Sequence, residues 1–427
     1  MKKALLCCFG IILGMWVAVS PALALSPDKP GSLPTFYDVP KNDLLGDPGS
    51  LIKSERVDAP DGARAWRVVY RSRKASGVPV AVSGLVVVPI TTKNNLPVIS
   101  WAHGTVGVAR YCAPSNVPNP VTNFVGYPSL KSTTPNDYGI PGLSTFINAG
   151  YVVVASDYQG LGTGEKHEYA VGLSQAQNAL DIVTAAQKLT PAVGNKVALL
   201  GWSQGGLAAV TAGENASYTP DLDIVGIAAL APANPKSFLI PDIAKQSTGG
   251  PRIGRIIILE RAYTWAYEKD LQLDQVLTET GIKVAEAASG QCIQQLSNTA
   301  DTEGGDTVLF KENANPDAWV NKFTENAIGQ KGSNIPVLVM QGTADNIIPP
   351  DSTDLYVRDA CEHHTPIFYK KYIGKDHRSL LPAAEVDFTT WISDRFTDHL
   401  TKKSALSNCS VAEIKLELGK LGTKGDY

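Results

Sequence analysis

This 427-residue chain has little excess charge, few histidines and, beyond its N-terminus, no long apolar run. Lysine and arginine number 38 against 41 aspartates and glutamates, which gives a formal net charge of −3. Such an even, mildly acidic balance gives no electrostatic reason to expect nucleic acid as a partner. No stretch after the leader is long enough to span a membrane, and no internal repeat is present.

Cysteine is also scarce, with six residues in all. Cys7 and Cys8 lie in a leader that we expect to be removed. The cysteines left in the mature chain are Cys112, Cys292, Cys361 and Cys409. Their isolated spacings do not suit a zinc site. An even number in an exported protein predicts two disulfides, and four cysteines allow three pairings.

The N-terminus has the pattern of a secretory signal peptide. Two lysines precede an apolar run over 4–19, and Pro21-Ala-Leu-Ala24 supplies a small-residue cleavage site. We therefore predict a signal peptide over residues 1–24 with cleavage after Ala24, and an exported protein that is either periplasmic or secreted. Loss of Lys2 and Lys3 changes the net charge from −3 to −5.

The apolar pattern predicts an α/β fold with eight strands. Two strands, 66–71 and 80–88, read as an antiparallel hairpin. Solid apolar runs then alternate with helical segments, as expected for strands buried on both faces of a parallel sheet. These six predicted strands cover 97–101, 151–156, 196–200, 224–230, 336–341 and 367–373.

Two segments interrupt the alternation. Residues 105–141 are rich in proline and asparagine, and a loop of this length is usually functional. Residues 235–334 are helix-rich and carry aromatic side chains that include Tyr263, Trp265, Tyr267, Trp319 and Phe323. We predict that this second segment is a cap, or lid, over the sheet's carboxyl edge, inserted into a core formed by 25–234 and 335–427. An ordinary helical subdomain without substrate contact is the alternative.

The most informative motif is Gly201-x-Ser203-x-Gly205, which lies between an apolar strand and a helix-forming run. A serine at such an elbow is held in an exposed, strained turn, and the glycines are needed because a Cβ would crowd it. Ser203 is therefore the candidate nucleophile. A near-copy around Ser174 has no strand before it, so we interpret Ser174 as a helix N-cap.

An activated serine needs a histidine base, and the base needs an orienting acid. Asp345 follows the strand 336–341, whereas Asp351 and Asp354 look like helix-start residues. His377 follows the last strand, and the adjacent Asp376 is read as a loop acid. The order Ser203, Asp345, His377 on successive strands is the order that this architecture requires.

The other histidines are less suited to proton transfer. His363 and His364 precede the last strand and are expected to be solvated, and His399 ends a predicted surface helix. His167 lies in a glycine-rich loop, where a structural role is favoured over a place in the site. His103 is expected to shape the turn after its strand.

A developing oxyanion needs two hydrogen-bond donors. The backbone N–H of Gln204 is one candidate, and the N–H of Thr105, within Trp101-Ala-His-Gly-Thr105, is the other. The hydroxyl of Tyr158 is a lesser candidate for the second donor. His103, Tyr158 and Trp202 are candidate pocket residues.

Together these motifs resemble the α/β-hydrolase superfamily and, more narrowly, the secretory lipase family that includes the Candida secreted lipases, in a bacterial-looking version. Further matching segments are Tyr111-Cys-Ala-Pro-Ser115, Ser156-Asp-Tyr-Gln-Gly-Leu-Gly162 and His167-x-Tyr169. The resemblance implies a mostly parallel eight-stranded sheet, a helical lid before the catalytic aspartate, and ester hydrolysis without metal or cofactor. It also implies the pairings Cys112–Cys292 and Cys361–Cys409.

The sequence thus predicts an exported carboxylic ester hydrolase acting on a small-molecule ester or lipid, with a lipid interface as a candidate partner. Because its histidine must be neutral to act as base, kcat/KM is expected to rise through about pH 6–7. A short-chain or aryl esterase remains open. So does a peptidase using Glu165 and Glu168 to bind the substrate amine, and so does a binding protein that keeps the fold without the chemistry.

Overall fold

The computed structural model describes residues 33–123, 125, 137–164, 166–239, 249–302, 306–311, 317–397 and 409. The expected signal peptide, its two cysteines, Glu165 and His399 lie outside these residues. All statements below concern the described part of the chain.

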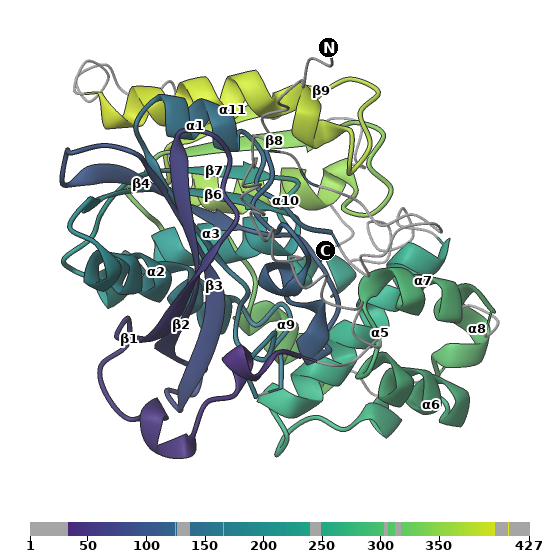
Figure 1. The fold of residues 1–427 in the computed structure, drawn as a ribbon. Helices are drawn as coiled ribbons and strands as arrows, with labels where there is room; N and C mark the ends of the chain where they lie inside the picture. Colours follow the sequence, from purple (N-terminus) through teal and green to yellow (C-terminus); the bar gives the residue numbers. More distant parts are fainter. Residues whose placement is uncertain are drawn as a thin grey trace, which may run out of the picture.

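Nine strands form a single twisted sheet at the centre of the molecule, in the order β1-β2-β3-β5-β4-β6-β7-β8-β9 (Figure 1). Strands β4 to β9 run parallel, while β1, β2 and β3 are joined antiparallel and β3 pairs antiparallel with β5. The strands are β1 (Leu51–Val57), β2 (Ala63–Arg73), β3 (Pro79–Pro89), β4 (Leu96–Ala102), β5 (Val152–Ser156), β6 (Val193–Trp202), β7 (Asp223–Leu230), β8 (Val337–Gly342) and β9 (Ile367–Tyr372).

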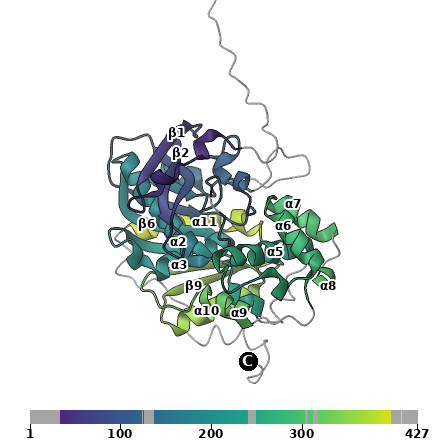
Figure 2. The same ribbon diagram turned by 90° about the horizontal axis from the view of Figure 1, so that it is seen from below.

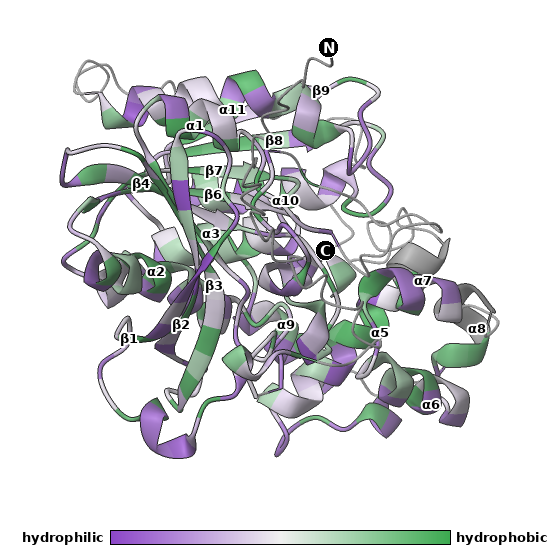
Figure 3. Ribbon diagram, in the orientation of Figure 1, coloured by the Kyte–Doolittle hydropathy of each residue, from purple (hydrophilic) through white to green (hydrophobic). Residues whose placement is uncertain are grey.

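The prediction of eight strands was therefore wrong by one, and the strand it missed is β1. Four consecutive residues of β1, from Lys53 to Arg56, are polar, and none of its residues is fully buried. An edge strand pairs on one side only and tolerates charged side chains, so it lacks the apolar signature of the central strands. Figure 3 shows this contrast between hydrophilic segments in β1 and β2 and the largely hydrophobic β4, β6 and β7.

Helices cover both faces of the sheet. Helices α2 (Gly172–Leu189), α3 (Gln204–Glu214) and α10 (Pro350–Glu362) pack against one face through a core that includes Leu180, Leu207 and Tyr356. Helices α1 (Leu143–Asn148) and α11 (Leu380–Phe396) cover the other face through Phe146 and Phe388. The parallel strands β4 to β8 are thus largely buried on both sides, which explains their apolar runs, whereas the edge strand β9 is only partly buried.

Ser174 was predicted to be an N-cap, and this is wrong. Helix α2 begins two residues earlier, at Gly172, with Val171 as its N-cap. The backbone N–H of Gly172 donates a hydrogen bond of 3.0 Å to Oδ1 of Asn326. An N–H group of the first helical turn is therefore bonded by a residue 154 positions away in the sequence. Ser174 is buried inside the helix.

The segment between β7 and β8 is helical and lies beside the sheet (Figure 2). Its helices are α5 (Gly249–Ala266), α6 (Glu279–Ala288), α7 (Ile293–Thr302), α8 (Asp306–Leu309) and α9 (Asp317–Glu325). Helix α5 packs against α6 and α7, and its side chains Ile257 and Leu259 continue the core that lies beneath α2 and α3. No helix in the described ranges is long and apolar enough to cross a membrane.

Two disulfides are present, and both implied pairings are confirmed. Cys112–Cys292 closes a loop of 180 residues and ties the segment after β4 to the start of α7. A backbone hydrogen bond of 3.0 Å from Ile293 N–H to Val106 O supports the same contact. Cys361–Cys409 closes a loop of 48 residues and links the end of α10 to the C-terminal tail.

Candidate active site

Ser203 lies in the sharp turn between β6 and α3. Its backbone has φ 59° and ψ −118°, a conformation that costs on the order of 1–3 kcal/mol for a residue with a Cβ. The turn closes only because two neighbours are glycines: a Cβ on Gly201 would lie 2.0 Å from Gly205 O, and one on Gly205 would lie 1.8 Å from Ala102 O. The Ser203 N–H donates to Leu230 O at 2.9 Å, which fixes the turn on β7.

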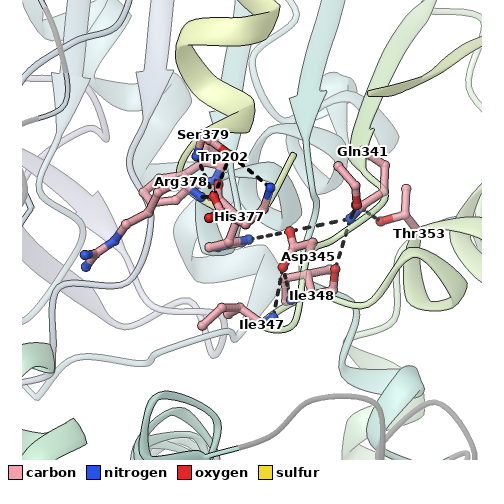
Figure 4. Close-up of polar contacts among 11 residues, drawn as sticks. Trp202, Gln341, Asp345, Ile347, Ile348, Thr353, His377, Arg378 and Ser379 are labelled. Carbon is pink, nitrogen blue, oxygen red and sulfur yellow. Dashed lines mark hydrogen bonds and ion pairs between the residues drawn. The ribbon is translucent and has the colours of Figure 1, made fainter. Parts of the chain in front are cut away.

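Asp345 and His377 come together from the loops after β8 and β9. The distance from His377 Nδ1 to Asp345 Oδ2 is 2.7 Å, and both side chains are buried (Figure 4). The carboxylate therefore holds the Nδ1–H tautomer, which leaves Nε2 as a hydrogen-bond acceptor. Among the described residues, no group is bonded to this buried Nε2 atom.

A set of fixed donors orients the carboxylate of Asp345. Its Oδ1 atom accepts hydrogen bonds of 2.9 Å from the backbone N–H groups of Ile347 and Ile348. Its Oδ2 atom faces His377 and the amide of Gln341 at 3.4 Å, and Thr353 Oγ1 donates to the Gln341 carbonyl at 2.6 Å. Sequence analysis missed Gln341 because a glutamine at the end of a strand carries no motif.

Trp202 couples the serine turn to the histidine. This residue directly precedes Ser203, and its indole Nε1–H donates to His377 O at 3.1 Å. The two rings lie 4.8 Å apart. Trp202 was expected to line the pocket, and the structure places it against His377.

The two expected oxyanion donors come from the start of α3 and from the segment after β4. Gln204 is the first residue of α3, and the first N–H groups of a helix lack partners within it and carry a partial positive charge. Thr105 is buried in the segment after β4, and its Oγ1 lies 2.8 Å from the hydroxyl of Tyr169. Tyr169 belongs to a motif quoted above but was given no role from the sequence.

His103 and Tyr158 form hydrogen bonds with the backbone of this segment. The His103 ring nitrogens face Gly104 O at 2.7 Å and Asp157 O at 3.2 Å, and burial lowers the pKa of the ring. Tyr158 donates its hydroxyl to His103 O at 3.1 Å, and its ring lies tilted against the imidazole with 4.4 Å between centroids. Both side chains are thus engaged with the turn, and neither lines the cavity described below.

His167 is buried and held between Gln159 and Gln204. Its Nδ1 atom lies 2.7 Å from Gln159 O, and its Nε2 atom lies 3.1 Å from the Gln204 amide nitrogen. Burial lowers its pKa to about 3, so the ring is neutral and accepts from Gln204. His363 and His364 are exposed, as expected.

A small, mainly apolar cavity of about 30 Å³ lies at Ser203. Its wall combines the serine with residues from the segment before α2, from the segment after β7, from α5 and from the loop after β8 that carries Asp345. The lining residues are Tyr169, Ala170, Ser203, Ala233, Pro235, Phe238, Arg255, Leu259, Ile347 and Ile348. Sequence analysis identified only Ser203 in this set, because the others are separated along the chain and meet only in the fold.

The competing acids are engaged elsewhere. Asp376 caps the turn that leads into α11 by accepting from the backbone N–H groups of Arg378 and Ser379. Asp354 bonds the Tyr369 hydroxyl and Lys371. Glu168, considered above for binding an amine, lines a separate cavity of about 390 Å³ and faces the N–H of Ala75 at 3.4 Å.

A mainly parallel sheet with a serine on a strand-to-helix elbow, and with an acid and a histidine after later strands, defines the α/β-hydrolase fold. The closed form of Candida antarctica lipase A has the same architecture. It superposes with a TM-score of 0.68 over 85% of each chain, at 22% identity.

The chain belongs to the secretory lipase family, whose sequence model matches residues 128–404. Lipase A of Arthroderma benhamiae is 24% identical over 420 residues, which cover 93% of this chain and 86% of that protein. A protein of Mycobacterium tuberculosis named as a probable inactive lipase is 23% identical over 414 residues, which cover 90% of this chain and 88% of that protein.

Proposed function

We propose that this chain is an exported serine hydrolase that cleaves carboxylic esters, of the acylglycerol or another lipid-like class, through an acyl-enzyme on Ser203. The observation that carries the proposal is the bond between His377 Nδ1 and Asp345, together with a buried Nε2 that has no bonded partner among the described residues and with Ser203 in a strained turn. Membership of a lipase family supports the same reaction class.

The proposed reaction uses each group at a stated atom. Ser203 Oγ attacks the ester carbonyl carbon while His377 Nε2 takes its proton, and Asp345 stabilises the imidazolium. The backbone N–H groups of Gln204 and Thr105 stabilise the oxyanion, each contributing about 2.7–4 kcal/mol. His377 then protonates the departing alcohol, and water attacks the acyl-enzyme by the reverse proton path.

The apolar wall of the Ser203 cavity supports a hydrocarbon-like acyl group. This wall is formed by Phe238, Leu259, Ile347 and Ile348. Of these, Phe238 and Leu259 belong to the helical segment 235–334. We propose that this segment is a cap on a core made of 25–234 and 335–427. We also propose that residues 1–24 are the export signal, which agrees with the two disulfides.

The test is hydrolysis of 4-nitrophenyl esters from acetyl to palmitoyl by oxidised protein spanning 25–427, with Ser203→Ala as control. Activity that depends on Ser203 and increases toward long chains is the expected result. A maximum at acetyl or butyryl would identify a short-chain esterase instead. Equal inertness of both proteins toward every ester would overturn the proposal and favour a non-catalytic role.

A further inference from the structure

The cavity at Ser203 has one cationic side chain in an otherwise mainly apolar wall. Arg255, from α5, is the only charged residue among the described residues that line it. A neutral acyl chain needs no guanidinium, and desolvating a charge is costly unless a group of opposite charge accompanies it. The wall therefore brings one guanidinium beside the nucleophile, where an anionic group of a substrate can join the acids that already accompany it.

Charged groups from several segments surround Arg255. Burial lowers the pKa of its guanidinium, and the neighbours that act on it are Tyr169, Asp137, Arg378 and Asp345. Asp137 also forms an ion pair with Arg378, with 3.5 Å between Oδ1 and Nη2. Burial raises the pKa of the Asp137 carboxyl to about 6, and the charges of Arg378 and Arg255 oppose this shift. Asp345 is already engaged with His377. A guanidinium has five N–H donors in a planar fork, which can bind a second carboxylate beside Asp137.

Tyr169 offers a second donor in the same cavity. Its hydroxyl lies 2.8 Å from Thr105 Oγ1, and it lines the wall together with Arg255 and Ser203. Burial raises the pKa of the Tyr169 hydroxyl, and the charge of Arg255 in the wall of the same cavity opposes this shift. A guanidinium and a phenol next to the reacting serine form a set of donors suited to an anionic oxygen group.

We propose that Arg255 and Tyr169 form an anion subsite, so that this enzyme prefers esters carrying a carboxylate or phosphate on either the acyl or the alcohol half. The inference rests on the proposed ester hydrolysis and specifies its substrate class. Arg255 binds substrate and takes no part in proton transfer.

The experiment compares matched neutral and anionic esters. For the acyl half, the pair is 4-nitrophenyl hexanoate and mono-4-nitrophenyl adipate. For the alcohol half, the pair is phenyl hexanoate and 4-carboxyphenyl hexanoate. In the wild type, kcat/KM for the anionic ester of at least one pair is expected to exceed that for its neutral partner about tenfold to 100-fold, and added salt should reduce this ratio.

Substitutions at Arg255 test the cause of the preference. Arg255→Met should remove it by lowering kcat/KM for the anionic ester at least tenfold more than for the neutral ester, while Arg255→Lys should retain part of it. Arg261→Met is the matched control. Arg261 lies on the same helix but contacts Ser289 and the Trp265 ring, so the ratio should not change.

Two outcomes would overturn the inference. A wild type that hydrolyses the neutral ester of both pairs at least as well as the anionic one refutes it without any variant. An equal loss on both esters in Arg255→Met would make Arg255 a structural link between α5 and Asp137. Failure of the proposed function would look different, because no ester turnover would then depend on Ser203, and both proposals would fall together.

Discussion

Replacing Asp345 by asparagine tests the catalytic assignment with almost no change in side-chain shape. Oδ1 of Asp345 accepts hydrogen bonds from the backbone N–H groups of Ile347 and Ile348. In the asparagine variant, only the amide oxygen can accept these two bonds. The asparagine oxygen must keep that place, so its NH₂ group faces His377 Nδ1. The imidazole must then carry its proton on Nε2, where it can no longer accept the proton of Ser203.

The structure also sets the size of the effect. Rotating the amide so that its oxygen faces His377 would restore the correct tautomer. It would also place the NH₂ group against the backbone N–H groups of Ile347 and Ile348, which costs about 1–3 kcal/mol for each of them. The total of about 2–6 kcal/mol corresponds to a fall in kcat of about 30-fold to 10⁴-fold. Loss of the carboxylate charge opposite the imidazolium acts in the same direction.

The assay is kcat on a 4-nitrophenyl ester, together with a thermal melt to show that the variant is folded. Asp376→Asn is the matched control, since Asp376 is adjacent to His377 but only caps the following turn. This control should keep kcat within about threefold, because an asparagine oxygen can accept the same backbone bonds. A folded Asp345→Asn protein with kcat within threefold of wild type would refute the assignment of Asp345.

Two further predictions concern stability. Burial raises the pKa of Asp181 to about 7, so the folded state binds more protons than the unfolded state at intermediate pH. The free energy of unfolding therefore falls as pH rises from about 4 to 7. Asp181→Asn, which cannot ionise, should lose less stability than wild type between pH 5 and pH 8, by on the order of 1–3 kcal/mol in urea unfolding; an identical pH dependence of both proteins would contradict this. Replacing Cys112 and Cys292 together by serine opens a loop of 180 residues and should lower the unfolding free energy by about 2–5 kcal/mol, measured by denaturant melts; an unchanged midpoint would show that the helical segment is held by other contacts.

The sequence predicted the parts of this protein that depend on short-range physics. The five strands β4 to β8 could be located because a strand buried on both faces is apolar along most of its length. Strand β1 and the start of α2 could not be located in this way, since a polar edge strand and a helix end bonded to Asn326 depend on residues far along the chain.

By itself, the sequence determined the order and spacing of Ser203, Asp345 and His377. Because the carboxyl ends of parallel strands meet at one edge of a sheet, residues that follow different strands converge there. Only the tertiary structure decided what surrounds them. Tyr169 precedes β6 in the sequence and Arg255 follows it, and both line the Ser203 cavity. No local pattern distinguishes Arg255 from Arg252 and Arg261 of the same helix as a cavity residue. Such contacts arise from how α5 packs on the core, and that packing is a sum over many distant side chains.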